Sequence, residues 1–494
     1  MSARTSPGAL VALSLFPLAV VVRFFQHHAS LLYPDGYQYL LMARGISEHL
    51  RPTTVLGPGG DQFVPSADAA AKPLFPLLVA VAHTLGLSWI DAATAITVLA
   101  GAWAVTALAL LVRRLTGCTA AGIAAGSLLL VSPGIGFWAG FSGPDPLAVA
   151  LVLSAALALA YGRTTVGGVL TGLAVAARPE VVLLVVAGAV LARRDPRHRD
   201  DVRRAGSVAL VTAVLVFAGL RIPVEIAEWK LAVSLPLAVL VVAVAVRAPI
   251  AAVRLGALVG VTTLVALSLS RSGPADVWDR DWPLLLLTAG AVGVLLREPR
   301  RDRTALVVVA ATLLLAGVYL TKNPGSGRYF TLLLPAAALL CGLAVAALGP
   351  RLRPAGLAAV AIVAVLGLTQ PVPGSRDYDM FPIVAQGLAQ RLDSTAPLVT
   401  AAPDAYGFWL PDRPVRQMRP GARGAILLDA TQRFFEPRLA ANGTVVARLG
   451  GAIVFSRPDL ELDAGPTVVV VGRVVPTHRN QSSSAIGTPH PPSA

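Results

Sequence analysis

The chain has few cysteines and few charged residues, and each shortage narrows its class. Only two of its 494 residues are cysteine, and both lie inside apolar runs, so the sequence predicts no disulfide framework and no cysteine metal cluster. Charged residues make up 14% of the chain, whereas a typical soluble domain has about 25%. Hydrophobic residues make up 55%, and the mean hydropathy is +0.69. The composition therefore predicts an integral membrane protein.

Apolar runs recur along residues 1–370, and many approach the length needed to cross about 30 Å of hydrocarbon. We predict membrane spans at 9–23, 88–112, 118–137, 145–161, 205–220, 231–246, 253–270, 283–296, 304–320, 329–348 and 355–369. Two shorter runs, 166–177 and 181–192, flank Arg178-Pro179-Glu180 and predict a further pair, with Arg178 and Glu180 as a structural ion pair. The predicted fold is a polytopic α-helical membrane protein with about 11–13 transmembrane helices.

The net charge of +14 is spread over short loops between the apolar runs. Arg113-Arg114 and the stretches 193–204 and 297–303 are examples. This distribution is the positive-inside pattern of a membrane protein and not the basic stripe of a nucleic-acid-binding surface, so no nucleic-acid partner is expected. It predicts a multi-pass protein of the bacterial cytoplasmic (inner) membrane, with the first long loop, 24–87, on the outer side.

The composition changes after Pro371, where the apolar runs end. An amphipathic helix is expected at 379–393, followed by short strands that include 398–401, 425–428, 444–449, 452–455 and 468–471. The sequence therefore predicts a transmembrane module at 1–370 and a small extracytoplasmic α/β domain at 371–476. The Ser/Pro-rich tail, 477–494, is predicted to be disordered.

Three charged residues at the predicted outer face are candidates for chemistry. Asp35 is flanked by tyrosines, and partial desolvation would suit it to act as a general base; the alternative is an interfacial aromatic belt with Asp35 as a turn or N-cap residue. Lys72 either binds a lipid phosphate or is a snorkelling cation. Arg328 either contacts a phosphate or Asp35, or is an ordinary flanking arginine.

Five segments in this order resemble a known family. They are Tyr33-Pro-Asp-Gly-Tyr-Gln-Tyr, Lys72-Pro-Leu-Phe-Pro-Leu-Leu, Ser142-Gly-Pro-Asp-Pro-Leu-Ala, Gly172-Leu-Ala-Val-Ala-Ala-Arg-Pro-Glu, and Arg328-Tyr-Phe with Pro335. Together with the spans, they resemble GT-C membrane glycosyltransferases over roughly 9–350, in the group of protein O-mannosyltransferases, aminoarabinose transferases and lipopolysaccharide galacturonosyltransferases. Each motif is weak alone, and the specificity comes from their order.

The resemblance implies transfer of a sugar, with inversion, from a polyprenyl-phosphate donor to an acceptor of the cell envelope: a lipid, a glycan or a protein. It implies that Asp35 is the base and that Lys72 and Arg328 bind the phosphate. Asp145 matches the family's acidic position at the head of the predicted span 145–161 and would orient the acceptor or a basic partner. Tyr37 and Tyr329 are further candidates for contacting or orienting the acceptor.

The chain departs from the family pattern at one position. Gly36 replaces the second acidic residue of many relatives, so no paired carboxylate holds a metal there, and no cofactor is expected, although a divalent metal stays open. Asp61 is another loop carboxylate, but nothing in its sequence surroundings argues for catalysis.

Two other classes of function remain as alternatives. A transporter or lipid flippase would typically show repeated halves, and the first outer loop has no repeat in the second half of the chain. A scaffold whose outer domain binds cell-wall polymer would leave the three charged residues without a catalytic role.

Overall fold

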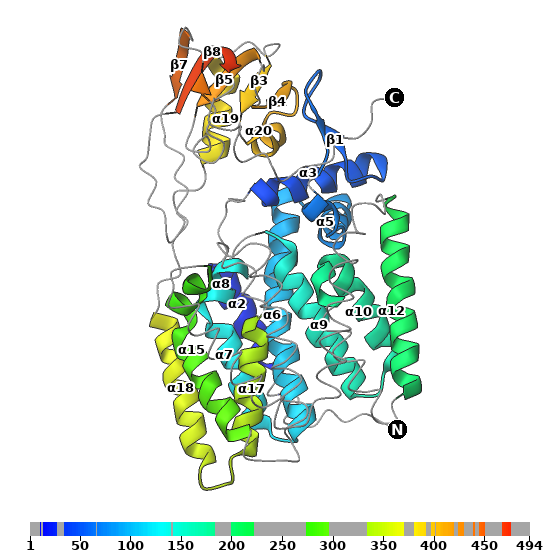
Figure 1. The fold of residues 1–494 in the computed structure, drawn as a ribbon, viewed down its shortest axis with the longest axis vertical. Helices are drawn as coiled ribbons and strands as arrows, with labels where there is room; N and C mark the ends of the chain where they lie inside the picture. Colours follow the sequence, from blue (N-terminus) through cyan, green and yellow to red (C-terminus); the bar gives the residue numbers. More distant parts are fainter. Residues whose placement is uncertain are drawn as a thin grey trace. The chain divides into compact units, whose positions relative to one another are not determined.

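The computed structural model (Figure 1) describes Leu10 and residues 13–26, 34–65, 67–139, 142–182, 199–221, 273–295, 333–369, 380–391, 397–400, 402–418, 423–428, 438–439, 444–449 and 467–475. The chain divides into two compact units. Unit 1 comprises Met1–Pro52 and Pro65–Gly374, and unit 2 comprises Thr53–Val64 and Ser375–Ala494. The predicted spans 231–246, 253–270 and 304–320, the strand 452–455 and the tail 477–494 lie outside the described residues.

The regular secondary structure in the described part of unit 1 is all helical. Its helices are α2 (Leu15–Gln26), α3 (Pro34–His49), α4 (Ala67–Ala70), α5 (Leu74–Thr84), α6 (Trp89–Thr116), α7 (Thr119–Val131), α8 (Pro133–Ala139), α9 (Pro144–Ala160), α10 (Thr164–Ala177), the 3-10 turn η1 (Pro179–Val181), α12 (Arg199–Gly219), α15 (Gly273–Leu295), α17 (Leu334–Ala347) and α18 (Arg353–Thr369). In Figure 1 the longer helices run side by side, and α3 lies across one end of them.

Length and apolarity together qualify two of the described helices, Trp89–Thr116 and Asp200–Gly219, to cross a membrane. The other apolar helices of the described part have 10–17 residues. Helix α6 has sharp ends: the Ser88 side chain accepts a hydrogen bond from the Asp91 amide, and Gly117 ends the helix in a left-handed conformation (φ +71°). The layout of 11–13 spans remains a prediction.

Small residues allow the helices of unit 1 to pack closely. Gly168 and Gly172 on α10 face Ala205 and Ala209 on α12, and an added Cβ at either glycine would clash with the α12 backbone. Gly122 on α7 approaches the backbone of α6 in the same way. Small residues four positions apart are the usual means by which helices associate in lipid, where no hydrophobic driving force brings them together.

Three features of unit 1 differ from the simple span prediction. The predicted span 118–137 is broken at Ser132 into α7 and α8, because Pro133 begins a new helix. Helix α15 starts before the predicted 283–296 run and is kinked at Asp281, two residues before Pro283. The polar first loop contains a full helix, α3, which the sequence prediction did not include.

Unit 2 contains a mixed β-sheet with strand order β4-β3-β5-β8-β6, and β7 also pairs with β8. Its elements are β1 (Thr54–Val55), β2 (Gln62–Phe63), α19 (Met380–Arg391), β3 (Leu398–Thr400), α20 (Pro403–Trp409), β4 (Val415–Gln417), β5 (Arg423–Leu428), β6 (Arg438–Leu439), β7 (Thr444–Leu449) and β8 (Thr467–Val475). Strand β3 is parallel to β4 and β5, and β8 is antiparallel to β5, β6 and β7.

A hairpin from the first loop belongs to unit 2. Strands β1 and β2 pair antiparallel, and backbone hydrogen bonds join Leu56 and Asp61 at its tip to Val415 of β4. The predicted domain boundaries placed all of 24–87 in the transmembrane module, whereas Thr53–Val64 packs with the C-terminal residues. The difference arises because pairing between segments so far apart in sequence leaves no local signal.

Candidate active site

Helix α3 supplies the candidate base. It begins at Pro34, whose fixed φ suits the first turn of a helix, so Asp35 is its second residue. An acidic residue is favoured there because the helix dipole is positive at its N-terminus. Tyr37 follows one half-turn later and is 2% exposed. The first turn of α3 thus contains the predicted base and one predicted acceptor-orienting residue.

Helices α3 and α5 pack through an aromatic contact. The rings of Tyr39 and Phe75 meet edge to face with their centroids 5.8 Å apart, and both side chains are buried. Such edge-to-face pairs stabilise packing beyond the area they bury. The contact ties α3 to the first turn of α5, which follows Lys72 by two residues. Two separate parts of the first loop, one with Asp35 and one with Lys72, are therefore carried by adjoining helices.

Lys72 is buried at 2% exposure, in the turn between α4 and α5. Its backbone amide donates to the carbonyl of Ala69 at 2.9 Å, and Pro73 precedes the first residue of α5. A snorkelling lysine keeps its ammonium group in water, which does not agree with this burial. Lysine is almost never fully buried unless it is paired. Lys72 is therefore a cation that the fold holds inside unit 1.

Asp145 and Arg178 form a buried ion pair. Oδ1 of Asp145 lies 2.6 Å from Nη2 of Arg178, and the two side chains are 8% and 0% exposed. Pro144 begins α9, which puts Asp145 in the first turn of that helix, while Arg178 ends α10 in an extended conformation before Pro179. The sequence interpretation paired Arg178 with Glu180, but in the structure Asp145 is an ion-pair partner of Arg178. Asp145 therefore contacts a buried basic side chain, and its role in orienting the acceptor or a basic partner stays a prediction.

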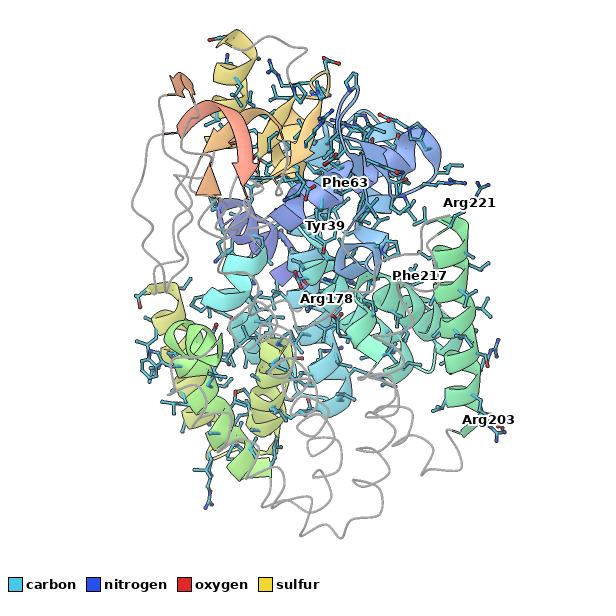
Figure 2. All side chains as sticks on the ribbon, turned by 45° about the horizontal axis from the view of Figure 1, so that its top comes forward. Tyr39, Phe63, Arg178, Arg203, Phe217 and Arg221 are labelled. Carbon is cyan, nitrogen blue, oxygen red and sulfur yellow. The ribbon has the colours of Figure 1, made fainter. Side chains whose placement is uncertain are left out.

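The elements that carry these residues are in contact. Helix α5 contacts α3, α9 and α10, and α3 also contacts α6. Figure 1 shows α3 and α5 at one end of the helices of unit 1. In Figure 2, Arg178 lies among the helices, whereas Arg203 and Arg221 project from opposite ends of α12. Lys72 and the Asp145–Arg178 pair are thus buried on contacting elements, while Arg203 and Arg221 are exposed.

Helix α3 adds a further, half-buried cation to this end of unit 1. Burial lowers the pKa of the Arg44 guanidinium from its ordinary value, and the nearby carboxylate of Glu48 opposes that shift. The ordinary pKa of an arginine is so high that Arg44 keeps its positive charge despite this shift. Arg328 and Tyr329 lie outside the described residues, so the predicted second phosphate cation stays a prediction.

A second buried charge cluster was not predicted from the sequence. Arg23 of α2 donates from Nη2 to the carbonyl of Leu129 at 2.9 Å and is attracted by the charge of Asp281. Asp281, at the kink of α15, accepts from Ser132 Oγ at 2.6 Å and from the Gly134 amide at 2.9 Å. The sequence signal that could have indicated this cluster is Asp281, which stands two residues before Pro283 at the start of an apolar run.

No group of three His, Cys, Asp or Glu side chains that could hold a metal ion occurs among the described residues. The carboxylate of Asp61 accepts a hydrogen bond from the Gln417 amide at 3.0 Å. Asp61 thus accepts a hydrogen bond from the backbone of β4 within unit 2.

Comparison with known proteins finds similarity in structure only. The sequence matches no protein-family model and no curated protein. ArnT from Cupriavidus metallidurans in the apo state has a TM-score of 0.58 at 16% identity, with 94% of this chain and 98% of that chain covered. The same protein bound to undecaprenyl phosphate gives 0.57, with the same identity and coverage.

The archaeal oligosaccharyltransferase AglB from Archaeoglobus fulgidus, in complex with an inhibitory peptide and a dolichol-phosphate, has a TM-score of 0.52 at 12% identity. The alignment covers 94% of this chain and 76% of that chain. At such identities the likeness establishes the fold, and it extends over nearly the whole chain. The chain therefore shares its fold with ArnT and AglB, which agrees with the resemblance of its five short motifs to GT-C membrane glycosyltransferases.

Proposed function

We propose that this protein is a glycosyltransferase that moves a sugar from a polyprenyl-phosphate donor to an extracytoplasmic acceptor. The observation that carries the proposal is Lys72, a lysine 2% exposed that lies beside α5, the helix packed against α3. A buried ammonium group is suited to an anionic headgroup, because the low local dielectric strengthens its attraction for a phosphate. The GT-C fold, shared with an ArnT structure that contains undecaprenyl phosphate, supports the same donor class.

The reaction follows from a base at Asp35. Its carboxylate takes the proton of an acceptor hydroxyl or amine while that atom attacks the anomeric carbon of the sugar. The new glycosidic bond forms as the bond between the anomeric carbon and the phosphate oxygen breaks. The electron pair leaves with the polyprenyl phosphate, and attack from the opposite face inverts the configuration. One carboxylate is sufficient, since no covalent sugar–enzyme intermediate is formed.

The other residues stabilise charge and orient the reactants. Lys72, together with Arg328, neutralises the charge that develops on the leaving phosphate. Asp145 pairs with the guanidinium of Arg178 at 2.6 Å, so a positive group that a charged substrate could re-orient lies next to α5. Tyr37 and Tyr329 contact the acceptor or the sugar. The proposal includes no cofactor and leaves a divalent metal open.

In this proposal the donor enters from the lipid on the outer side of the bacterial inner membrane, the side on which the sequence predicts the first loop and the C-terminal domain. This position gives one substrate a path from the bilayer and gives the acceptor a path from the cell envelope.

The test uses the purified full chain in lipid nanodiscs with a labelled polyprenyl-phosphate sugar and a membrane extract as the source of acceptor. The parent is expected to transfer label, and Asp35→Asn and Asp35→Ala are expected to lose about 10²–10⁴-fold in rate. Equal insertion of the variants is checked by size-exclusion chromatography. Transfer retained by both variants would remove Asp35 as base.

A transporter or lipid flippase is the alternative from another class. It would give substrate-dependent flux across a vesicle membrane without formation of a glycosidic bond. Flux in the absence of any transfer by the parent would therefore favour the alternative.

A further inference from the structure

The first loop passes through both units between its two candidate catalytic residues. Asp35 starts α3 in unit 1, the chain then enters unit 2 as Thr53–Val64, and it returns to unit 1 before Lys72. The hairpin is therefore the middle of the segment that joins the proposed base to the proposed phosphate cation. Contacts that hold the hairpin also limit the movement of this segment. The contacts of this hairpin within unit 2 define what the constraint is.

The hairpin covers the free edge of the sheet. On one side, β4 pairs with β3: the Leu398 amide donates to Pro414, and the Met418 amide donates to Thr400, both at 2.8 Å. On the other side, the Val415 amide donates to the Leu56 carbonyl at 2.8 Å. Strand β4 is the last strand in the order of the sheet, and an open edge of this kind is a template for pairing with another chain.

Asp61 completes the edge with both its backbone and its side chain. Its amide donates to the Val415 carbonyl at 3.0 Å, and its carboxylate oxygen accepts from the Gln417 amide at 3.0 Å. Gly59 adds a weaker contact, because its carbonyl lies 3.4 Å from the Arg416 guanidinium. The outward amides of Val415 and Gln417 and the carbonyl of Val415 are thus all bonded to two hairpin residues.

The turn of the hairpin fits the sheet without spare room. Gly57 has φ +76°, and an added Cβ would clash with the carbonyl of Arg413. Gly59 has a similar φ of +72°, yet an added Cβ there meets nothing within 4 Å. Leu56 is 3% exposed and packs against Gly407 of α20. The two glycines therefore share the same backbone conformation and differ in whether a side chain would separate the hairpin from β4.

We infer that Thr53–Val64 is an anchor by which unit 2 holds the catalytic loop, and that Asp61 and Gly57 are positioning residues for sugar transfer. The inference rests on the proposed function, since the loop it positions carries Asp35 and Lys72. The anchor acts by limiting where the two ends of the loop can move. Helices α3 and α5 stay packed through Tyr39 and Phe75 when the anchor is released, but the segment that joins them loosens. A misplacement of about 1 Å can cost on the order of 10²-fold in rate.

The test compares Gly57→Ala with Gly59→Ala in the full chain in nanodiscs. Hydrogen exchange over 413–418 reports the anchor, because the Val415 and Gln417 amides are bonded to the hairpin. Gly57→Ala is expected to speed exchange there and to lower kcat by about tenfold, with the KM for the donor nearly unchanged. Gly59→Ala pays the same left-handed penalty and is expected to match the parent in both measurements. Exchange over 398–400 checks that the sheet remains folded.

Asp61 provides a second and independent pair of variants. Asp61→Ala removes the acceptor for the Gln417 amide and is expected to repeat the effect of Gly57→Ala. Asp61→Asn keeps an oxygen at the same place and is expected to restore most of kcat. A merely structural role in unit 2 would change exchange without changing kcat.

The outcomes separate the two proposals. Faster exchange with parental kcat in both Gly57→Ala and Asp61→Ala overturns the anchor and leaves the transferase proposal intact. Parental exchange in both variants overturns the anchor as well, because the described contacts would not hold the hairpin in solution. A parent that transfers no sugar overturns the transferase proposal and the inference with it, whatever the exchange rates are.

Discussion

The described part of unit 1 contains two buried clusters that each hold one arginine and one aspartate. The side chains of the two clusters are bonded in different ways. Asp145 and Arg178 meet directly at 2.6 Å, and they join α9 to α10 next to α5. Arg23 and Asp281 are instead fixed by neutral groups: Arg23 by the Leu129 carbonyl, and Asp281 by Ser132 Oγ and the Gly134 amide. Burial is nearly complete in both clusters. Burial alone therefore does not distinguish a charge with a substrate role from one that holds helices together.

The bonding partners do distinguish them. A charge that is bonded to backbone groups cannot turn toward a ligand without breaking the helix ends it joins. A direct pair can re-orient when a charged substrate arrives, because each partner is a side chain. We therefore propose that the Asp145–Arg178 pair serves the reaction and that the Arg23–Asp281 cluster holds α2, α8 and α15 together.

The largest expected effect comes from breaking the direct pair. Asp145→Ala leaves the Arg178 guanidinium buried without this carboxylate, and we expect a loss of about 3–5 kcal/mol in the free energy of unfolding. Denaturant titration of the detergent-solubilised protein measures it. The double variant Asp145→Leu with Arg178→Met is expected to recover most of the stability but no sugar transfer. Parental transfer by the double variant would remove the pair from the reaction.

Replacing the buried cation of the first loop is expected to act on the reaction. Lys72→Gln removes the charge that we propose faces the leaving phosphate, and we expect kcat/KM for the donor to fall by about 10²–10³-fold. Arg203→Gln is the matched control, because it removes an exposed cation at the end of α12. Steady-state transfer assays compare the two. Equal losses in both variants would mean that net charge matters and the position of Lys72 does not.

The second cluster should respond in the opposite manner. Asp281→Ala leaves the Ser132 hydroxyl and the Gly134 amide without this acceptor and is expected to cost about 2 kcal/mol of stability. The rate of transfer per folded molecule should stay at the parental value. Asp281→Asn retains an oxygen acceptor and should lose less stability. A drop in kcat for Asp281→Asn at unchanged thermal stability would contradict the architectural assignment.

The smallest effects concern the apolar packing around both clusters. Gly172→Ala places a Cβ against the backbone of α12 and should destabilise the protein by about 1 kcal/mol. Gly206→Ala, on α12 itself, meets nothing within 4 Å and should be neutral or stabilise by up to about 1 kcal/mol, because alanine has the higher helix propensity. Thermal unfolding of the two variants gives opposite shifts if α10 and α12 pack as described.

Much of the helical fold follows from local sequence signals. Helices α6, α9 and α12 correspond to apolar runs of the sequence. Each run ends close to a glycine or a basic residue, so hydropathy and capping signals locate the helices. Helix α3 escaped prediction because it is polar on average and starts among tyrosines that also suit an interfacial belt. The break at Ser132 escaped because a proline at the start of a new helix looks the same as one inside a span.

Contacts between residues far apart in the chain are the part of the site that could not be predicted from the sequence. A pairing of Arg178 with Glu180 could be predicted because the two are neighbours in sequence, whereas the ion pair of Arg178 with Asp145 on another helix could not. The sequence around Asp61 does not indicate a role for it, because its carboxylate accepts a hydrogen bond from the distant Gln417 amide. Asp35, Lys72 and Arg328 were found through short motifs, and their roles as base and phosphate cations remain predictions.

The most direct test of the account is to locate the donor on the protein. A photoreactive polyprenyl phosphate, bound to the full chain in nanodiscs, would be cross-linked and mapped by mass spectrometry. We predict labelled peptides from 34–49 and 67–84, competed by excess undecaprenyl phosphate and weakened by Lys72→Gln. Labelling confined to other helices, or unchanged by Lys72→Gln, would contradict the proposal that α3 and α5 hold the headgroup.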